Sequence, residues 1–224
     1  MTDYRRFAIY FIPKTGSSLQ KFGDKWLDIV QPNAFPNKDK IKRTNWIKIP
    51  KKYGFHGTLK APFRLRSDKN LDDLIISSKN ICKSIKSFSL SGLKLSIIEN
   101  ALALTLINNS SSMSALSNQF VIQLDKFRAP LSKEEISVKR SRNLTAKQDY
   151  NLLHWGYPYV MEQFYFHLTL TNTLDEENLN LAKEILREEL TEDCLAPQTV
   201  DEVGLVGEQI NGDFKIITRL SLTG

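Results

Sequence analysis

Two of the three histidines in this 224-residue chain stand in nearly identical sequence surroundings. His56 lies in Phe-His-Gly-Thr-Leu, and His167 lies in Phe-His-Leu-Thr-Leu. Each is followed two residues later by a threonine, Thr58 or Thr169, and residues two apart on a strand point to the same face. Each motif therefore presents one imidazole and one hydroxyl together, a combination that can move protons and hold an anion.

Two histidines that face one another suit the cleavage of a phosphodiester. One imidazole removes a proton from the attacking water or hydroxyl, and the other protonates the departing oxygen. We predict His56 and His167 as this acid–base pair, with Thr58 and Thr169 holding the phosphate oxygens, and leave open which histidine is the acid. No H-E-x-x-H sequence or His/Asp/Glu cluster accompanies them, so we expect neither a metal nor another cofactor.

Four further residues are candidate substrate-binding groups. Lys60 continues the polar face of the first motif strand, unless it is a solvated edge lysine. Arg128 could clamp a phosphate with both ends of its guanidinium, or lie on the surface at a helix end. Tyr157 and Tyr159, in a Gly-Pro turn, could stack on a base or donate a hydroxyl, or simply cover the core. The third histidine, His154, is interpreted as structural.

The two motifs open copies of a repeated succession of elements, about 111 residues apart. Each copy contains a strand, a helix and two strands joined by a tight turn. We expect these elements at 55–59, 70–85, 88–98 and 101–107, and again at 164–171, 173–190, 200–210 and 213–222. Asn211-Gly212 is the strongest hairpin signal in the chain, and Thr173–Glu176 reads as a capping box. The pattern predicts a duplicated α+β unit.

The remaining segments are expected to frame this unit. A strand is predicted at Tyr4–Pro13, followed by a helix that Ser17 or Ser18 caps and whose apolar stripe runs to Ile29. Residues 31–52, rich in proline and lysine, are predicted to be a long surface loop. An amphipathic helix over 113–124 leads into a polar segment at 127–161, where capping boxes begin at Ser132 and Thr145.

Composition narrows the class of protein. Hydrophobic residues make up 41% of the chain, enough for a core, and no apolar run approaches the roughly 20 residues that span a bilayer. Two cysteines, neither in a C-x-x-C, favour a reducing cytoplasm over a disulfide scaffold. The net charge of +6 favours anionic partners. We expect a cytoplasmic monomer that binds a small anionic phosphodiester and no membrane, with RNA as a further partner to test.

The paired H-x-T motifs resemble those of the 2H phosphoesterase superfamily. Four segments also resemble a bacterial subfamily described as phosphonate-metabolism proteins, over 53–63, 127–131, 155–159 and 166–171. Gly57 departs from the pattern, because superfamily members often carry an apolar residue there, and this predicts looser packing behind the first motif.

The resemblance implies a bilobal α+β fold, with two antiparallel sheets and outer helices that flank a central cleft. We expect one domain over residues 1–224, with lobes centred on 53–110 and 162–224 and a connector or lid at about 111–161. It also implies metal-independent hydrolysis of a cyclic nucleotide or sugar phosphate, in phosphonate or ribose-phosphate metabolism. The alternatives are an RNA-processing enzyme, such as a 2′,5′-RNA ligase or an RNA end phosphodiesterase, and a non-catalytic nucleotide-binding module.

Overall fold

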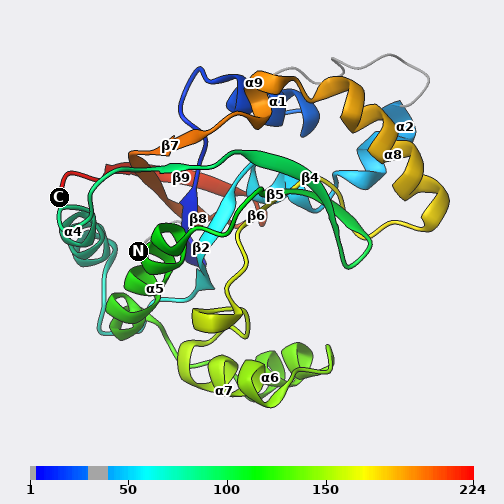
Figure 1. Ribbon diagram of the computed structural model, residues 1–224. Coiled ribbons are helices and arrows are strands. Elements are labelled where there is room, and N and C mark those ends of the chain that lie inside the picture. The colour runs from blue at the N-terminus through cyan, green and yellow to red at the C-terminus, as the bar shows by residue number, and fades with distance from the viewer. Residues whose placement is uncertain (1–3, 30–39) are drawn as a thin grey trace.

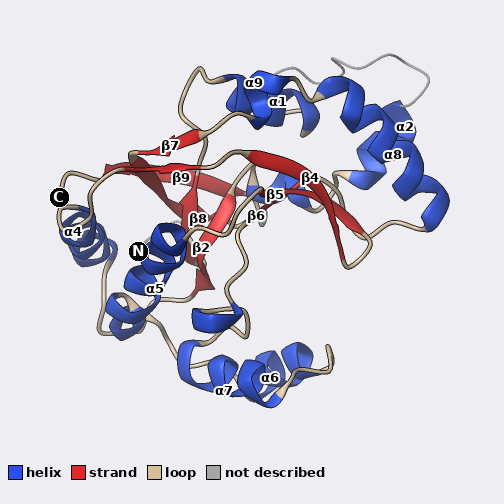
Figure 2. Ribbon diagram, in the orientation of Figure 1, coloured by secondary structure: helices blue, strands red, loops and turns tan. Residues whose placement is uncertain are grey.

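The computed structural model describes residues 4–29 and 40–224 and has a mixed α+β architecture. Its strands form one antiparallel sheet of seven strands, in the order β4-β5-β6-β2-β1-β8-β9, and a second antiparallel sheet in which β3 pairs with β7 (Figures 1 and 2). The strands are β1 (Phe7–Phe11), β2 (Gly57–Phe63), β3 (Phe88–Leu90), β4 (Leu93–Ile98), β5 (Ala101–Leu106), β6 (His167–Thr169), β7 (Gln198–Val200), β8 (Glu202–Glu208) and β9 (Phe214–Ser221). The predicted α+β class with two antiparallel sheets is confirmed.

The two copies of the repeated unit exchange strands in the large sheet. β6, from the second copy, pairs with β5, which belongs to the hairpin of the first copy. β2, from the first copy, lies toward the β8–β9 hairpin of the second copy, with β1 between them. As a consequence the two motif strands, β2 and β6, become direct neighbours in the middle of the sheet.

The helices pack mainly on one face of this sheet. They are α1 (Ser18–Trp26), α2 (Lys40–Trp46), α3 (Pro50–Tyr53), α4 (Leu71–Cys82), α5 (Ser111–Gln123), α6 (Lys133–Arg140), α7 (Ala146–Trp155), α8 (Glu176–Glu189) and α9 (Glu192–Leu195), with short 3-10 turns η1 (Asp125–Phe127) and η2 (Met161–Gln163). Side chains from α1, α4, α5 and α8 share one core with the inward residues of the strands, such as Leu104 and Leu168. Helices α6 and α7 lie apart from the helices of the core (Figure 1), and no residue of α6 is buried.

The predicted surface loop at 31–52 is wrong where the structure describes it. Helices α2 and α3 occupy 40–46 and 50–53, while 31–39 lie outside the described residues. Trp46 and Ile47 are buried, and the buried Arg43 pairs with Asp28. The prediction missed α2 because the segment is rich in lysine and because one of the buried residues of the helix is Arg43, which a search for apolar periodicity does not count.

Several boundaries also differ from the predictions. The helix of the second copy is capped by Asp175, whose carboxylate accepts from the Asn178 backbone N–H at 2.8 Å, and not by a box at Thr173. The expected strand at 88–98 is divided into β3 and β4 at Gly92, where φ is +110°, and the one at 200–210 into β7 and β8. Ile29 lies beyond the end of α1 and is exposed. The capping boxes at Ser132 and Thr145 are both present.

Candidate active site

The two H-x-T motifs meet across the β2–β6 pairing. Gly57 is the register partner of Leu168, and the strands are antiparallel. Continuing this register places Thr58 opposite His167 and His56 opposite Thr169, all on the same face. Directly opposed residues have Cβ atoms about 4.5–5.5 Å apart, and diagonal ones such as His56 and His167 about 7–8 Å. The register therefore places one imidazole and one hydroxyl from each motif on the same face of two neighbouring strands.

Both imidazoles are held in the same way. His56 Nδ1 lies 2.9 Å from the Gly54 carbonyl oxygen, and His167 Nδ1 lies 2.9 Å from the Tyr165 carbonyl oxygen. A carbonyl only accepts, so each Nδ1 carries the proton and donates it. Each Nε2, at the far side of the ring, is left for chemistry. His56 Nε2 lies 3.1 Å from Thr58 Oγ1, whose hydroxyl can donate to it.

A phenylalanine before each histidine fixes the motif to the core. The space that a Cβ of Gly57 would fill is taken by the Phe166 ring, with Cε2 only 2.5 Å from that position. Phe55 packs in the same manner over Gly23 of α1: its Cδ1 lies 1.9 Å from the position that a Cβ on Gly23 would take. The Phe166 ring also meets the Phe11 ring edge-on at 5.4 Å. Gly57 thus leaves no gap behind the first motif: the expected looser packing is wrong, because an aromatic ring from the second motif fills the space.

The surroundings of His56 favour its neutral form. The Tyr10 ring stacks on the imidazole, with centroids 3.7 Å apart and planes inclined by 24°. Burial lowers the pKa of His56 from its usual 6.5 to about 4; the Gly54 carbonyl opposes this, and the charge of His167 adds to it. At neutral pH the imidazole of His56 is therefore a proton acceptor through Nε2.

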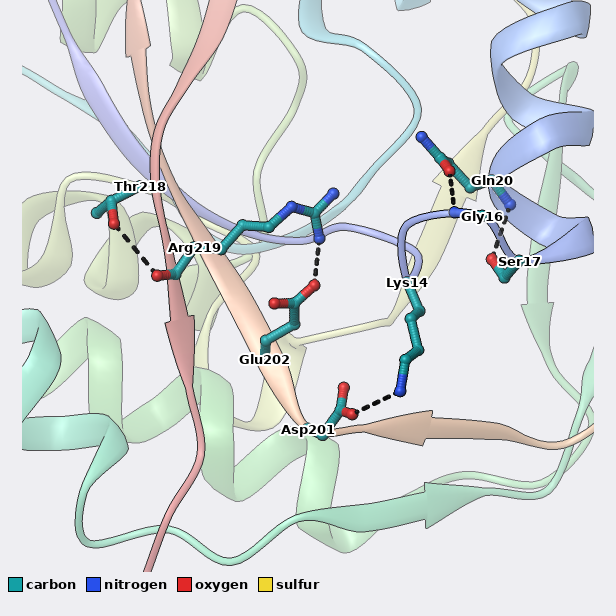
Figure 3. Close-up of polar contacts among 8 residues, drawn as sticks. All are labelled: Lys14, Gly16, Ser17, Gln20, Asp201, Glu202, Thr218 and Arg219. Atoms are coloured by element: carbon teal, nitrogen blue, oxygen red, sulfur yellow. Dashed lines mark hydrogen bonds and ion pairs between the residues drawn. The ribbon is translucent and has the colours of Figure 1, made fainter.

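An aromatic pocket of about 370 Å³ adjoins His56. Tyr10, Tyr53 and Phe214 form one wall, and the Tyr53 and Phe214 rings stack at 5.0 Å. The volume and the aromatic wall are typical of a small-molecule site. At the rim, Arg219 of β9 pairs with Glu202 of β8 (Figure 3).

Polar groups on α1 also line this pocket. Gln20 and Asp24 both line it, and Gln20 Oε1 accepts from the Gly16 backbone N–H at 2.6 Å (Figure 3). Burial raises the pKa of Asp24, against the opposing effects of Gln20 and Arg219. The pocket is thus lined by the guanidinium of Arg219, the amide of Gln20 and the carboxyl group of Asp24.

Lys60 does not lie beside the histidines. A β-bulge places Lys60 opposite Ile9, while Thr58 stays opposite Tyr10. Lys60 is 3% exposed, and its Nζ donates to the Val121 carbonyl of α5 at 3.1 Å. It lines a second, smaller cavity whose walls contain neither histidine.

The other predicted residues gather around this second cavity. Arg128 lines it, but its Nε donates to Asp125 at 2.8 Å and its Nη2 donates to the His154 carbonyl at 2.9 Å. Tyr157 also lines it, and burial raises the pKa of Tyr157 to about 12. Tyr159 meets the Tyr157 ring edge-on at 5.6 Å.

Some site residues could not be found from the sequence. Tyr10 belongs to a strand that carries no motif, and only the β1–β2 register brings it over His56. Arg6, two residues before Ala8 on the same face, lines the second cavity with Lys139 of α6.

No helix within 4–29 and 40–224 has the length and apolar character needed to span a membrane.

Comparison with known proteins gives two curated relatives. The chain is 33% identical over 176 residues to ribose 1,5-bisphosphate phosphokinase PhnN of Janthinobacterium sp. (strain Marseille), covering 75% of this chain and 39% of that protein. It is 26% identical over 178 residues to the protein of the same name from Laribacter hongkongensis (strain HLHK9), covering 78% and 42%. The chain thus spans only about two fifths of the length of these relatives.

Among solved structures, the crystal structure of E. coli LigT complexed with 3′-AMP is similar in fold. It superposes with a TM-score of 0.50 at 12% sequence identity, covering 98% of this chain and 99% of LigT. A family model described as protein of unknown function, DUF1045, matches residues 58–215, more than two thirds of the sequence. The chain belongs to the DUF1045 family.

Proposed function

We propose that this chain is a phosphodiesterase of the 2H type, which opens a cyclic nucleotide or sugar phosphate by acid–base catalysis with two histidines. The observation that carries the proposal is the matched anchoring of His56 and His167. Both donate Nδ1–H to the carbonyl two residues upstream, on adjacent strands, so both Nε2 atoms are available on one face.

The geometry supports a direction for the proton transfers. The low pKa of His56 makes it the general base: its Nε2 takes a proton from water as the water oxygen bonds to phosphorus. His167, as the general acid, gives a proton from Nε2 to the departing oxygen as that P–O bond breaks. Thr169 donates to a non-bridging oxygen, where negative charge grows, and Thr58 does the same once its hydroxyl turns from His56 Nε2 to the substrate.

A small substrate suits the site better than a long strand of RNA. The pocket beside His56 has the volume of a small-molecule site, and the net charge of +6 is modest for a protein that follows an RNA backbone. The similar fold of LigT, whose structure contains 3′-AMP, supports a nucleotide-like ligand. The relatives named after ribose 1,5-bisphosphate support a sugar phosphate and a role in phosphonate or ribose-phosphate metabolism.

The kinase activity in the name of those relatives finds no sequence support here. The 224 residues contain no G-x-x-x-x-G-K-[ST] loop, which holds nucleotide phosphates in many kinases.

A panel of substrates tests the proposal. Cyclic nucleotides, cyclic sugar phosphates and short 2′,5′- and 3′,5′-linked RNAs are incubated with the protein, and phosphorus NMR identifies which bond opens. Opening of a cyclic phosphate supports the proposal. Cleavage that rises with oligonucleotide length and falls steeply with salt would favour the RNA enzyme, and tight binding without cleavage would favour the binding module.

A further inference from the structure

A small cationic cavity lies beneath the α6–α7 helices. It encloses about 50 Å³, several times the roughly 10–15 Å³ that one water needs. Its walls carry five cationic side chains and one carboxylate: Arg6, Lys60, Arg64, Arg128, Lys139 and Glu135. This excess of positive charge makes the cavity suitable for an anion the size of a phosphate group.

The three arginines are already neutralised by carboxylates. Arg6 binds Glu208 through two hydrogen bonds of 2.6 and 2.7 Å, and Arg128 binds Asp125 at 2.8 Å. Arg64 donates to Glu135 at 2.7 Å, which also fixes α6 over the cavity. These pairs hold the walls in place but leave two positive charges without a balancing partner.

Those two charges are Lys60 and Lys139. Within the described part of the chain, neither ammonium has a carboxylate at ion-pair distance. Lys60 makes one hydrogen bond, to the Val121 carbonyl, and Lys139 lies over the Tyr157 ring at 5.2 Å. A charged group that is 3% exposed is costly to bury without a counter-ion, and burial lowers the pKa of Lys60 to about 8. An anion in the cavity would supply the missing partner.

The cavity and the histidine pair are connected through β1 and the residue that precedes it. Arg6, directly before β1, and Tyr10 of β1 are four residues or roughly 13 Å apart, and Tyr10 stacks on His56. The Arg6 guanidinium also lies 5.8 Å from the Phe214 ring, which lines the aromatic pocket. A phosphorylated sugar, together with the reach of a lysine side chain, spans such an interval.

We propose that this cavity binds a second anionic group of the substrate, a terminal phosphate monoester, through Lys60 and Lys139. The assignment deepens the proposed function, because it adds a phosphomonoester to the molecule whose phosphodiester lies between His56 and His167. The substrate class is then a cyclic phosphodiester that carries a separate terminal phosphate.

Binding of ribose 5-phosphate tests the cavity without any cleavage. Isothermal titration calorimetry compares the full chain with Lys60→Met and Lys139→Met, which keep an unbranched apolar side chain of nearly the same length and remove the charge. Lys79→Met, an exposed position on α4, is the matched control. We expect each cavity variant to weaken binding about 10- to 100-fold, the usual effect of losing a hydrogen bond to a charged group, while the control binds like the parent. Should Lys60→Met fail to fold, Lys139→Met alone decides, because Lys139 is only partly buried.

Two outcomes would overturn the assignment. One is a parent protein that does not bind ribose 5-phosphate. The other is an affinity that falls in His167→Ala but not in either lysine variant, since the phosphate would then occupy the histidine site. Neither outcome depends on turnover, so failure of this assignment is distinguishable from failure of the proposed hydrolysis.

A kinetic comparison adds a second measurement. Adenosine 2′,3′-cyclic phosphate is compared with the same compound bearing a 5′-phosphate, by the ratio of kcat/KM. We expect the parent and Lys79→Met to prefer the phosphorylated compound at least 10-fold, and both cavity variants to lose most of that preference. Equal kcat/KM for the two compounds in the parent would also overturn the assignment.

Discussion

The pKa of His56 offers a direct test of how its surroundings prepare it as a base. The difference between the usual 6.5 and about 4 corresponds to about 3 kcal/mol against the protonated form. Burial is the main cause, and the Tyr10 ring, stacked 3.7 Å from the imidazole, provides one face of that burial. Replacing Tyr10 with alanine admits water to this face. We expect the pKa of His56 to rise by at least one unit toward 6.5, which is about 1.4 kcal/mol or more.

Proton NMR of the imidazole signals measures this shift without a substrate. The chain has only three histidines, so the signals of His56, His154 and His167 can be assigned by replacing each in turn. Tyr10→Phe is the matched control, because it keeps the stacked ring and removes only the hydroxyl; its His56 should titrate within a few tenths of a unit of the parent. The signal of His154, on α7, reports whether the fold is kept.

The sign of the effect on activity follows from the role of His56. A general base works only when deprotonated, so kcat/KM of the parent should rise with pH through about 4 and be fully developed well below neutral pH. In Tyr10→Ala the rise of kcat/KM with pH should move to higher pH, by the same amount as the pKa of His56 measured by NMR. A parent His56 that titrates near 6.5, or an unchanged pKa in Tyr10→Ala, would refute the reasoning.

Three further predictions follow from other contacts. Gly57→Ala should lower the free energy of unfolding in urea by about 1–3 kcal/mol, because its Cβ would meet the Phe166 ring at 2.5 Å; an unchanged urea midpoint would show that the ring moves freely. Arg64→Ala should speed amide hydrogen exchange of α6 several-fold, with a loss of at most about 1 kcal/mol in global stability, because the lost pair with Glu135 is exposed; unchanged exchange in α6 would contradict the role given to this pair. Incubation with excess EDTA should leave turnover unchanged, since two imidazoles supply both proton transfers; a tenfold loss that Mg²⁺ or Zn²⁺ restores would point to another mechanism.

The sequence predicted which side chains of the two motifs share a face better than it predicted what surrounds them. The repeated H-x-T motifs indicated that a histidine and a threonine share one face in each copy, because the alternation of side chains along a strand is a local property. The duplication also suggested equivalent places for the two motif strands. Local patterns do not record which copy supplies the neighbouring strands, so the exchange that brings β2 beside β6 was not visible in advance.

Lys60 shows where a local rule fails. Alternation placed it on the face of His56 and Thr58, but a β-bulge changes the register after Thr58 and carries Lys60 to a separate cavity. A bulge depends on the partner strand, here β1, and so cannot be inferred from β2 alone. Tyr10 was missed for the same reason, since only pairing between distant segments stacks it on His56.

The separate replacement of His56 and His167 by alanine tests the central claim most directly. With the cyclic phosphate that the panel identifies as the best substrate, each variant should lose about 10²- to 10⁴-fold in kcat, while the substrate Kd stays nearly unchanged. Turnover that stays at the parent level in either variant would contradict the account, because a single imidazole would then suffice.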